Sequence, residues 1–298
     1  MSKRTRQQLI TGLLFISPWS VGFCALTLYP AAASAYYSLT NFNVLAAPRW
    51  VGLANYSRLF SADPNVPLSI YNTAYLAFVG VPLQLIVGLI VAILLDQRVL
   101  RVRSVYRTIF FLPTLMPVVA STILFIWILN PQYGIVDDIL SLAHLPQPGW
   151  FADPTWSKPS LILLSIWGVG TTMVIYLAGL QGINPELYEA ADLDGAGWLP
   201  KTLYVTIPLV SPVTLFNLVV GLIGAFQIFA PLYLIGGNGT SGSPQGSLLL
   251  YALYLYANAF QYLQMGYASA MAWTLFVIIL VLTIIVMRSS RYWTHYEI

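Results

Sequence analysis

Long runs without a charged side chain alternate with short polar segments along this chain. A helix needs about 20 mostly apolar residues to cross a bilayer, and several runs reach that length. The last run, 202–287, is too long for one helix, and the turn-rich stretch 236–244 divides it. The pattern predicts an all-α polytopic membrane protein with six spans, near 9–37, 70–95, 108–130, 159–181, 207–235 and 267–287.

Proline occurs inside most of these spans. Because it removes a backbone donor and clashes with the preceding turn, it kinks a helix unless the surroundings compensate. The sequence therefore predicts a kinked, gated bundle, although ordinary packing irregularity explains each single proline equally well. These prolines are Pro18, Pro30, Pro82, Pro113, Pro117, Pro212 and Pro231.

The composition agrees with a membrane location. Of the 298 residues, 58% are hydrophobic and 8% charged, so a core of ordinary proportions cannot bury the apolar surface. The 13 Lys and Arg residues form no basic stripe, which argues against nucleic-acid binding. Cys24 has no partner for an intrachain disulfide, and His144 and His295 stand far apart. We therefore assign no metal site and no catalytic residue.

The basic residues predict the orientation. Ten of them precede the first span, follow the last, or lie between spans 2 and 3 and spans 4 and 5; three lie on the other side. Because basic residues accumulate on the cytoplasmic side, both termini are expected in the cytoplasm. The ten are Lys3, Arg4, Arg6, Arg98, Arg101, Arg103, Arg107, Lys201, Arg288 and Arg291, and the three are Arg49, Arg58 and Lys158.

The polar loop between spans 4 and 5 has the signals of a short helix. Asn184 can cap its first turn, Pro185 suits its first position, and Glu186 lies near its positive end. Gly195 can adopt the left-handed conformation that ends a helix. These signals predict a helix over 185–193.

Three carboxylates of this helix, Glu186, Glu189 and Asp192, recur at intervals of three and are expected to share a face. They have no histidine or metal set beside them, which disfavours acid catalysis. A solvated acidic face and a docking surface for a partner both remain open, and we favour docking.

The same segment resembles a known signature. Glu189, Ala190 and Ala191 are followed by Gly195 and then by 205–208, Val-Thr-Ile-Pro, with the order and spacing of the EAA signature of type I ABC importer permeases. That family usually has Ile and Leu where this chain has Val205 and Ile207, and both differences are conservative. The resemblance covers about residues 72–287 and implies the MetI-like transmembrane fold.

Within that family, the chain looks most like the MalF-like sugar-permease branch. The passages at 52–56, 106–113 and 260–270 carry this weaker resemblance. It implies import of a sugar or oligosaccharide, with glycerol-phosphate diesters or another polar solute as the alternative.

The resemblance also implies partners. The helix at 185–193 would couple to a cytoplasmic ABC ATPase dimer through Glu186, Glu189, Ala190, Ala191, Asp192 and Gly195. A second permease subunit, an extracytoplasmic sugar-binding protein and the inner membrane lipid of a prokaryote complete the expected assembly. None of the three lysines stands in a phosphate-binding loop, so ATP and Mg²⁺ are expected on the partner ATPase.

The expected organisation has three parts. Residues 1–69 hold a cytoplasmic tail, the first span and an outer loop. Residues 70–288 form the ABC type-1 transmembrane core, with the EAA loop at 182–212, and residues 289–298 form a cytoplasmic tail.

The predicted substrate path rests on side chains that recognise neutral sugars. Aromatic faces stack on sugar rings, and amides bond to hydroxyl groups, although the same residue types also pack helices. The glycine-rich loop 236–246 is interpreted as a flexible turn or as a gate beside this path. The candidates are Asn217, Phe226, Gln227, Phe229, Tyr233, Tyr254, Asn258 and Gln261.

Two other classes of protein were weighed. An ion-coupled secondary transporter normally needs a carboxylate or histidine within its spans, and the predicted spans have no ionisable residue except tyrosines and Cys24. The second class is a polytopic membrane enzyme or structural scaffold; an enzyme should show converging histidines or carboxylates near the membrane face, and no such set is visible. A neutral substrate also fits these spans better than an ionic one.

Overall fold

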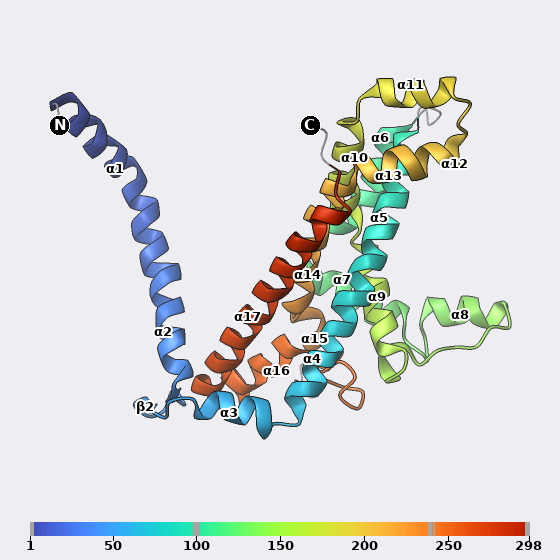
Figure 1. Cartoon of the computed structure of the whole chain (residues 1–298). Coiled ribbons are helices and arrows are strands. Elements are labelled where there is room, and N and C mark those ends of the chain that lie inside the picture. Colours follow the sequence, from blue (N-terminus) through green and yellow to red (C-terminus); the bar gives the residue numbers. More distant parts are fainter. Residues whose placement is uncertain (1–2, 98–101, 238–239, 241, 296–298) are drawn as a thin grey trace. The chain divides into compact units, whose positions relative to one another are not determined.

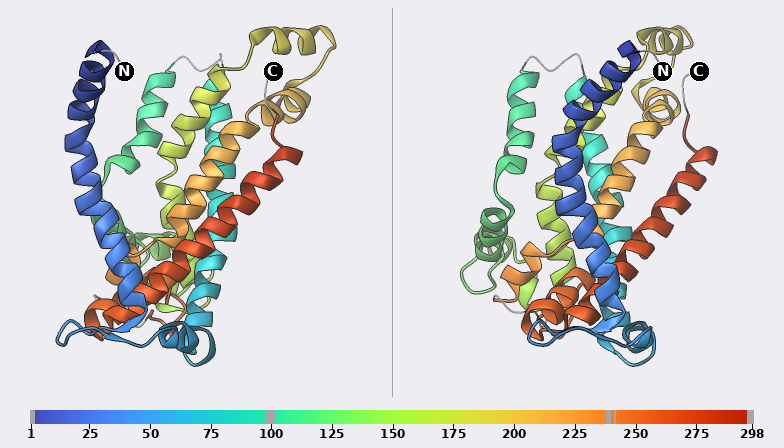
Figure 2. Two further views of the ribbon diagram at one scale, coloured as in Figure 1. Left: turned by 60° about the vertical axis from the view of Figure 1, so that its left-hand side comes forward. Right: turned by 90° about the vertical axis from the view of Figure 1, so that its left-hand side faces the viewer.

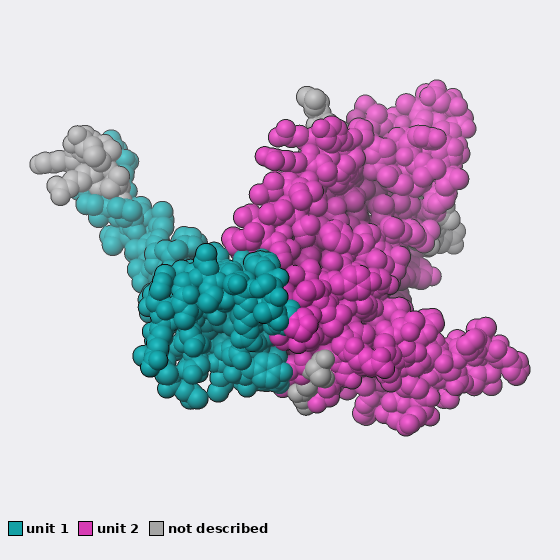
Figure 3. Space-filling model, turned by 60° about the horizontal axis from the view of Figure 1, so that its bottom comes forward, with its two compact units in different colours: residues 1–63, 255–274 teal, residues 64–254, 275–298 magenta. Residues whose placement is uncertain are grey.

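The computed structural model describes residues 3–97, 102–237, 240 and 242–295. Almost all regular structure is helical (Figures 1 and 2). The chain divides into two compact units, residues 1–63 with 255–274 and residues 64–254 with 275–298 (Figure 3). The first unit therefore joins the N-terminal segment to a stretch near the C-terminus, which the sequence pattern did not indicate.

The first unit begins with one long helical segment. It consists of α1 (Lys3–Phe23), the π-helical turn η1 (Cys24–Leu28) and α2 (Tyr29–Ser38). A small antiparallel hairpin of β1 (Thr40–Asn41) and β2 (Arg49–Trp50) follows, and α3 (Ala54–Ser61) comes next.

In this unit, hydrogen bonds to the segment 38–42 bring together two of the passages that resemble the sugar permeases, 52–56 and 260–270. The Asn55 side chain donates to the carbonyl oxygens of Ser38 (2.8 Å) and Thr40 (2.9 Å). The Gly266 N–H donates to the Phe42 carbonyl oxygen at 2.9 Å. A Cβ on Gly266 would overlap the Thr40 carbonyl oxygen, so only glycine allows this approach.

The second unit contains most of the spans. Its helices up to the loop helix are α4 (Asn65–Tyr75), η2 (Leu76–Gly80), α5 (Val81–Asp96), α6 (Arg103–Phe111), η3 (Leu112–Leu115), α7 (Val118–Ile128), α8 (Ile135–Leu142), η4 (Trp150–Ala152), α9 (Ser157–Trp167) and α10 (Gly170–Gln181). The remaining elements are α11 (Pro185–Leu193), α12 (Trp198–Lys201), η5 (Thr202–Thr206), α13 (Ile207–Leu209), α14 (Ser211–Phe226), α15 (Ala230–Ile235) and η7 (Ser290–Tyr292). Three further elements, α16 (Tyr251–Tyr256), η6 (Ala257–Gln261) and α17 (Met265–Ser289), lie at or across the unit boundaries.

Among the described residues, four helical segments are long and apolar enough to cross a membrane: Ile10–Ser38, Asn65–Asp96, Ser211–Ile235 and Met265–Tyr292. Two more candidates are bent pairs, Arg103–Leu115 with Val118–Ile128 (97°) and Ser157–Trp167 with Gly170–Gln181 (50°). The predicted number of six is reached when each bent pair counts as one span.

The two bends follow from local sequence. Pro113 and Pro117 flank the 97° bend. Neither can donate a backbone hydrogen bond, so the helix is interrupted between them. Gly168 lies at the 50° bend, where glycine weakens the helix. The predicted kink at the first site is therefore confirmed.

Three other prolines do not break their helices. Each follows a π-helical turn that ends two residues earlier: η1 before Pro30, η2 before Pro82 and η5 before Pro208. In each turn an N–H bonds to the carbonyl five residues back, as Val81 does to Leu76. The wider turn leaves room for the proline ring, and membrane helices tolerate proline through such adjustments. The kinks expected at Pro30 and Pro82 are replaced by these turns.

The core of the second unit lies where α5, α10 and α14 pack together. Met173 and Tyr176 of α10 and Ala92 of α5 have no exposed surface, and Val210 is 1% exposed. This packing holds α10, whose C-terminal end leads directly into α11.

Candidate functional site

The loop helix α11 forms as the sequence predicts, over Pro185–Leu193. The Asn184 side-chain oxygen accepts the Glu186 N–H at 3.0 Å, which caps the first turn. Gly195 has a φ of +73°, the left-handed conformation expected just beyond the helix end.

The helix is anchored on one side. Ile183, directly before it, is 7% exposed and belongs to the core of the second unit. The Tyr188 ring packs against that core, and its hydroxyl lies 3.1 Å from the Thr206 hydroxyl. Leu193, the last residue of the helix, is 90% exposed. A firmly held helix therefore presents an apolar side chain to its surroundings.

The predicted acidic face is divided. Asp192 forms an ion pair with Lys201 at 2.6 Å, and Glu189 and Asp192 both line a cavity of about 500 Å³. Asp96 and Arg103, near the ends of α5 and α6, line the same cavity. Glu186 is exposed outside it and accepts a bond from the Asn184 amide at 3.3 Å. Because Asp192 is largely exposed, its ion pair contributes at most about 1 kcal/mol.

The remaining residues predicted for coupling lie on the same loop. Ala190 and Gly195 are exposed, and Ala191 is half-buried. All the residues of the predicted coupling set therefore lie on one short helix and its C-terminal turn.

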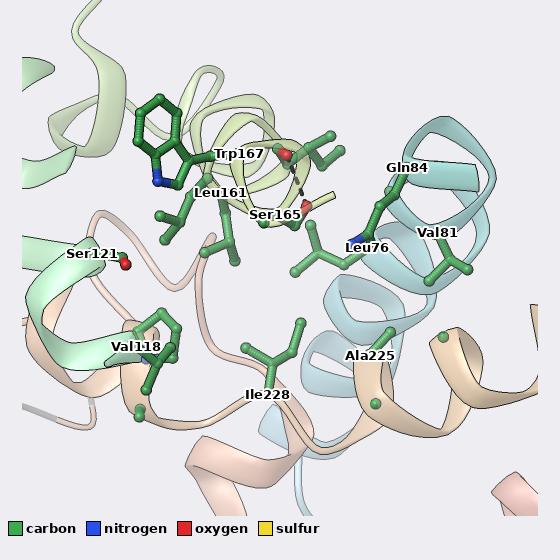
Figure 4. Close-up of a pocket in the computed structure, with 18 of the residues that line it drawn as sticks. Leu76, Val81, Gln84, Val118, Ser121, Leu161, Ser165, Trp167, Ala225 and Ile228 are labelled. Carbon is green, nitrogen blue, oxygen red and sulfur yellow. Dashed lines mark hydrogen bonds between the residues drawn. The ribbon is translucent and has the colours of Figure 1, made fainter. Parts of the chain in front are cut away.

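A larger cavity of about 750 Å³ lies in the second unit, between η2, η3, α5, α7, α9, α10, α14 and α15 (Figure 4). Gln84 and Ser121 line it, together with Ser165, whose hydroxyl donates to the Ile162 carbonyl oxygen at 2.7 Å. Trp167 adds an aromatic ring. None of the described residues that line this cavity carries a charged side chain.

Two of the predicted path residues, Gln227 and Phe229, line this cavity. Asn217 and Phe226 are buried in α14 without lining it, and Phe226 belongs to the apolar core. Tyr233 packs on Phe229 with 5.6 Å between ring centroids.

The outer three predicted path residues lie elsewhere. Tyr254 is buried within the second unit, Asn258 is buried within the first unit, and Gln261 is exposed there. None of them lines the cavity.

Sequence reasoning missed Gln84, Ser121, Ser165 and Trp167 as cavity residues. Ser121 follows the proline-flanked bend by a single turn, and Ser165 and Trp167 precede the bend at Gly168. Polar and aromatic residues next to a proline or a glycine within a span were therefore the available signal.

The glycine-rich loop ends in a well-held segment. The Asn72 side chain, 1% exposed, donates to the carbonyl oxygens of Gly246 (2.9 Å) and Leu249 (3.0 Å). The Thr73 hydroxyl accepts the Tyr251 N–H at 2.9 Å. Residues 238, 239 and 241 of this loop lie outside the described part, and its role as a gate stays a prediction.

A family model described as "Binding-protein-dependent transport system inner membrane component" matches residues 84–293. The chain is 38% identical to the probable ABC transporter permease protein YesP of Bacillus subtilis, over 99% of this chain and 95% of that protein. It is 31% identical to the lactose transport system permease LacF of Rhizobium radiobacter, over 95% and 94% of the two chains. It is 30% identical to the trehalose/maltose transport system permease MalF of Thermococcus litoralis, over 98% and 97%.

Solved structures show the same fold. The crystal structure of a bacterial importer of the acidic polysaccharide alginate matches with a TM-score of 0.76 and 22% identity, over 98% of both chains. The alginate transporter in complex with its alginate-loaded periplasmic protein also matches, with a TM-score of 0.76 and 23% identity over 99% and 98%.

Proposed function

We propose that this chain, which belongs to the family of binding-protein-dependent transport system inner membrane components, forms half of the translocation path for a sugar or oligosaccharide. The observation that carries the proposal is the 750 Å³ cavity among the spans, lined by amides, hydroxyls and aromatic rings. Its volume lies within the usual range for small-molecule sites.

The lining suits a sugar. Trp167 and Phe229 offer aromatic faces for a sugar ring, and Gln84 and Gln227 can both donate to and accept from hydroxyl groups. A glycerol-phosphate diester carries a negative charge, and the described lining residues offer no cation to pair with it. Relatives named for lactose and for trehalose/maltose transport support the same choice.

The proposed energy source is a cytoplasmic ATPase that receives α11 in a cleft. The capped, anchored helix can transmit a push without deforming, and exposed Leu193 can enter an apolar recess. ATP and Mg²⁺ would bind to that ATPase, since this chain has no phosphate-binding loop.

The proposed orientation places both termini and α11 in the cytoplasm. It rests on the distribution of basic residues along the sequence, of which Arg98 and Arg101 lie outside the described part. A second permease subunit would complete the path, and an extracytoplasmic binding protein would deliver the sugar from the opposite side.

Reconstitution tests the proposal. The importer is assembled in proteoliposomes with its partner subunits. It is expected to take up the sugar carried by its co-purifying binding protein only when ATP is present on the side of the membrane that carries the ATPase. Glu189→Lys and Gly195→Arg should abolish ATP-driven uptake while the protein still inserts in the membrane. Normal uptake by both variants would contradict the coupling role, and uptake driven by an ion gradient alone would contradict the whole assignment.

A further inference from the structure

The short helix α8 presents three distinct sides. It lies in the second unit, between α7 and α9, at the end of that unit opposite α11 (Figures 1 and 2). One side packs on the protein, one is apolar and exposed, and one is polar and exposed. The family signature near α11 lies elsewhere in the sequence and gives this segment no role.

The packed side fixes the helix in place. Val136 and Leu140 contact the apolar cluster that contains Trp150. Asp137 is only 4% exposed, and its carboxylate accepts the Trp150 indole N–H at 2.8 Å. A buried hydrogen bond to a charged acceptor is among the stronger ones, so α8 is held in a defined orientation.

The apolar side has no cover within this chain. Ile135 is 63% exposed, Ile139 59% and Leu142 82%. These residues are spaced at i, i+4 and i+7, so their side chains form one stripe along the helix. Tyr133 (63%) and Leu145 (54%), just outside the helix, are similarly exposed.

The polar side consists of Asp138 and Ser141, both exposed. On a helical turn they lie beside the apolar stripe and away from Val136 and Leu140. Around the helix axis, therefore, one side contacts protein, the next is suited to lipid and the third is suited to water. This is the arrangement that a helix needs at the boundary where protein, bilayer and water meet.

The position along the chain agrees with such a boundary. The preceding candidate span ends at Ile128, and the next begins at Ser157. Trp127, in the last turn of α7, is 66% exposed, and tryptophan concentrates at the level of the lipid headgroups. The exposed stripe thus follows the end of a candidate span that carries an exposed tryptophan.

We propose that α8 is an interfacial helix that inserts Ile135, Ile139 and Leu142 into the headgroup–acyl boundary of the leaflet opposite α11. No lysine or arginine lies between 130 and 156, all of which are described, so the insertion relies on apolar contact. Zwitterionic lipid is therefore a sufficient partner.

A fluorescent probe tests this directly in the assembled importer. Cys24 is replaced by serine, and single cysteines are introduced by Ile139→Cys, Leu142→Cys and, as the matched control on the polar side, Ser141→Cys. Each is labelled with an environment-sensitive dye and reconstituted in phosphatidylcholine vesicles, with or without a lipid that carries a nitroxide near the headgroup. The dye at 139 and 142 should emit at shorter wavelength and lose most of its fluorescence to the nitroxide lipid, whereas the dye at 141 should be quenched by aqueous iodide.

Two results would overturn the proposal. Quenching of 139 and 142 by iodide would mean that the stripe faces water. Protection of both positions from iodide and from the nitroxide lipid would mean that a protein partner covers them.

Discussion

The N-cap of α11 provides a sharp test of how a local hydrogen bond supports coupling. Asn184→Ala removes the side-chain oxygen that accepts the Glu186 N–H at 3.0 Å. Asn184→Ser is the matched control, since serine keeps an acceptor at the same position and is an equally good cap. Neither change alters the apolar contacts of Tyr188 or Ile183.

The expected cost follows from the single bond that is lost. Replacing a capping Asn by Ala destabilises a helix by about 1 kcal/mol. A helix of only 9 residues is not stable on its own in water. The loss of the capping bond therefore shifts the equilibrium between the intact and the frayed first turn. One kcal/mol corresponds to roughly a fivefold change in an equilibrium constant.

Hydrogen exchange of the permease subunits without the ATPase measures this fraying. In Asn184→Ala the amides of the first turn of α11 should exchange about fivefold faster than in the unmodified protein, because losing the cap costs about 1 kcal/mol. If α11 docks as a helix, the ATPase should also bind up to about fivefold more weakly, because the docking-competent fraction falls. Asn184→Ser should be close to the unmodified protein in both measurements.

Equal exchange in the Ala and Ser variants would refute the capping argument. Faster exchange in Asn184→Ala with unchanged ATPase affinity would instead refute the idea that a preformed helix is what docks.

Three other changes have expected outcomes. Asn72→Ala leaves the buried Leu249 carbonyl and the partly buried Gly246 carbonyl without their donor, at about 1–3 kcal/mol for the buried one, and should lower the melting temperature in detergent; an unchanged value would contradict the role of this side chain. Gln84→Leu removes one amide from the cavity and should raise the KM for the sugar by roughly threefold to tenfold, from one lost hydrogen bond, with basal ATPase activity unchanged. Gly266→Ala forces a Cβ against the Thr40 carbonyl oxygen and should destabilise the protein by about 1–3 kcal/mol, whereas Gly224→Ala, where a Cβ meets no atom within 4 Å, should not.

Features that depend on local sequence were predictable. The cap at Asn184, the proline at 185 and the glycine at 195 act within single turns, so the bounds of α11 follow from them. The apolar runs likewise marked the spans, because the length of a membrane helix is set by the bilayer.

Features that depend on distant contacts were not predictable. Asn55 and Gly266 both contact the segment 40–42 in the first unit, although more than two hundred residues separate them. Gln84 joins Ser121 and Ser165 at the cavity only because two spans bend, and the angles of those bends cannot be deduced from composition. The expected path residues Asn258 and Gln261 lie in a different unit because residues 255–274 group with residues 1–63, an association between distant parts of the chain.

The π-helical turns before Pro30, Pro82 and Pro208 also change the phase of their helices. Such a turn holds one residue more than an α-helical turn, so every side chain beyond it is rotated by about 100° around the axis relative to an uninterrupted helix. In the span Asn65–Asp96, the periodicity of α4 therefore does not continue into α5. The extra residue of this turn thus sets which side of the following helix faces the neighbouring spans, and Pro82→Ala, which permits a regular turn, is expected to reset that orientation for Gln84 and all of α5.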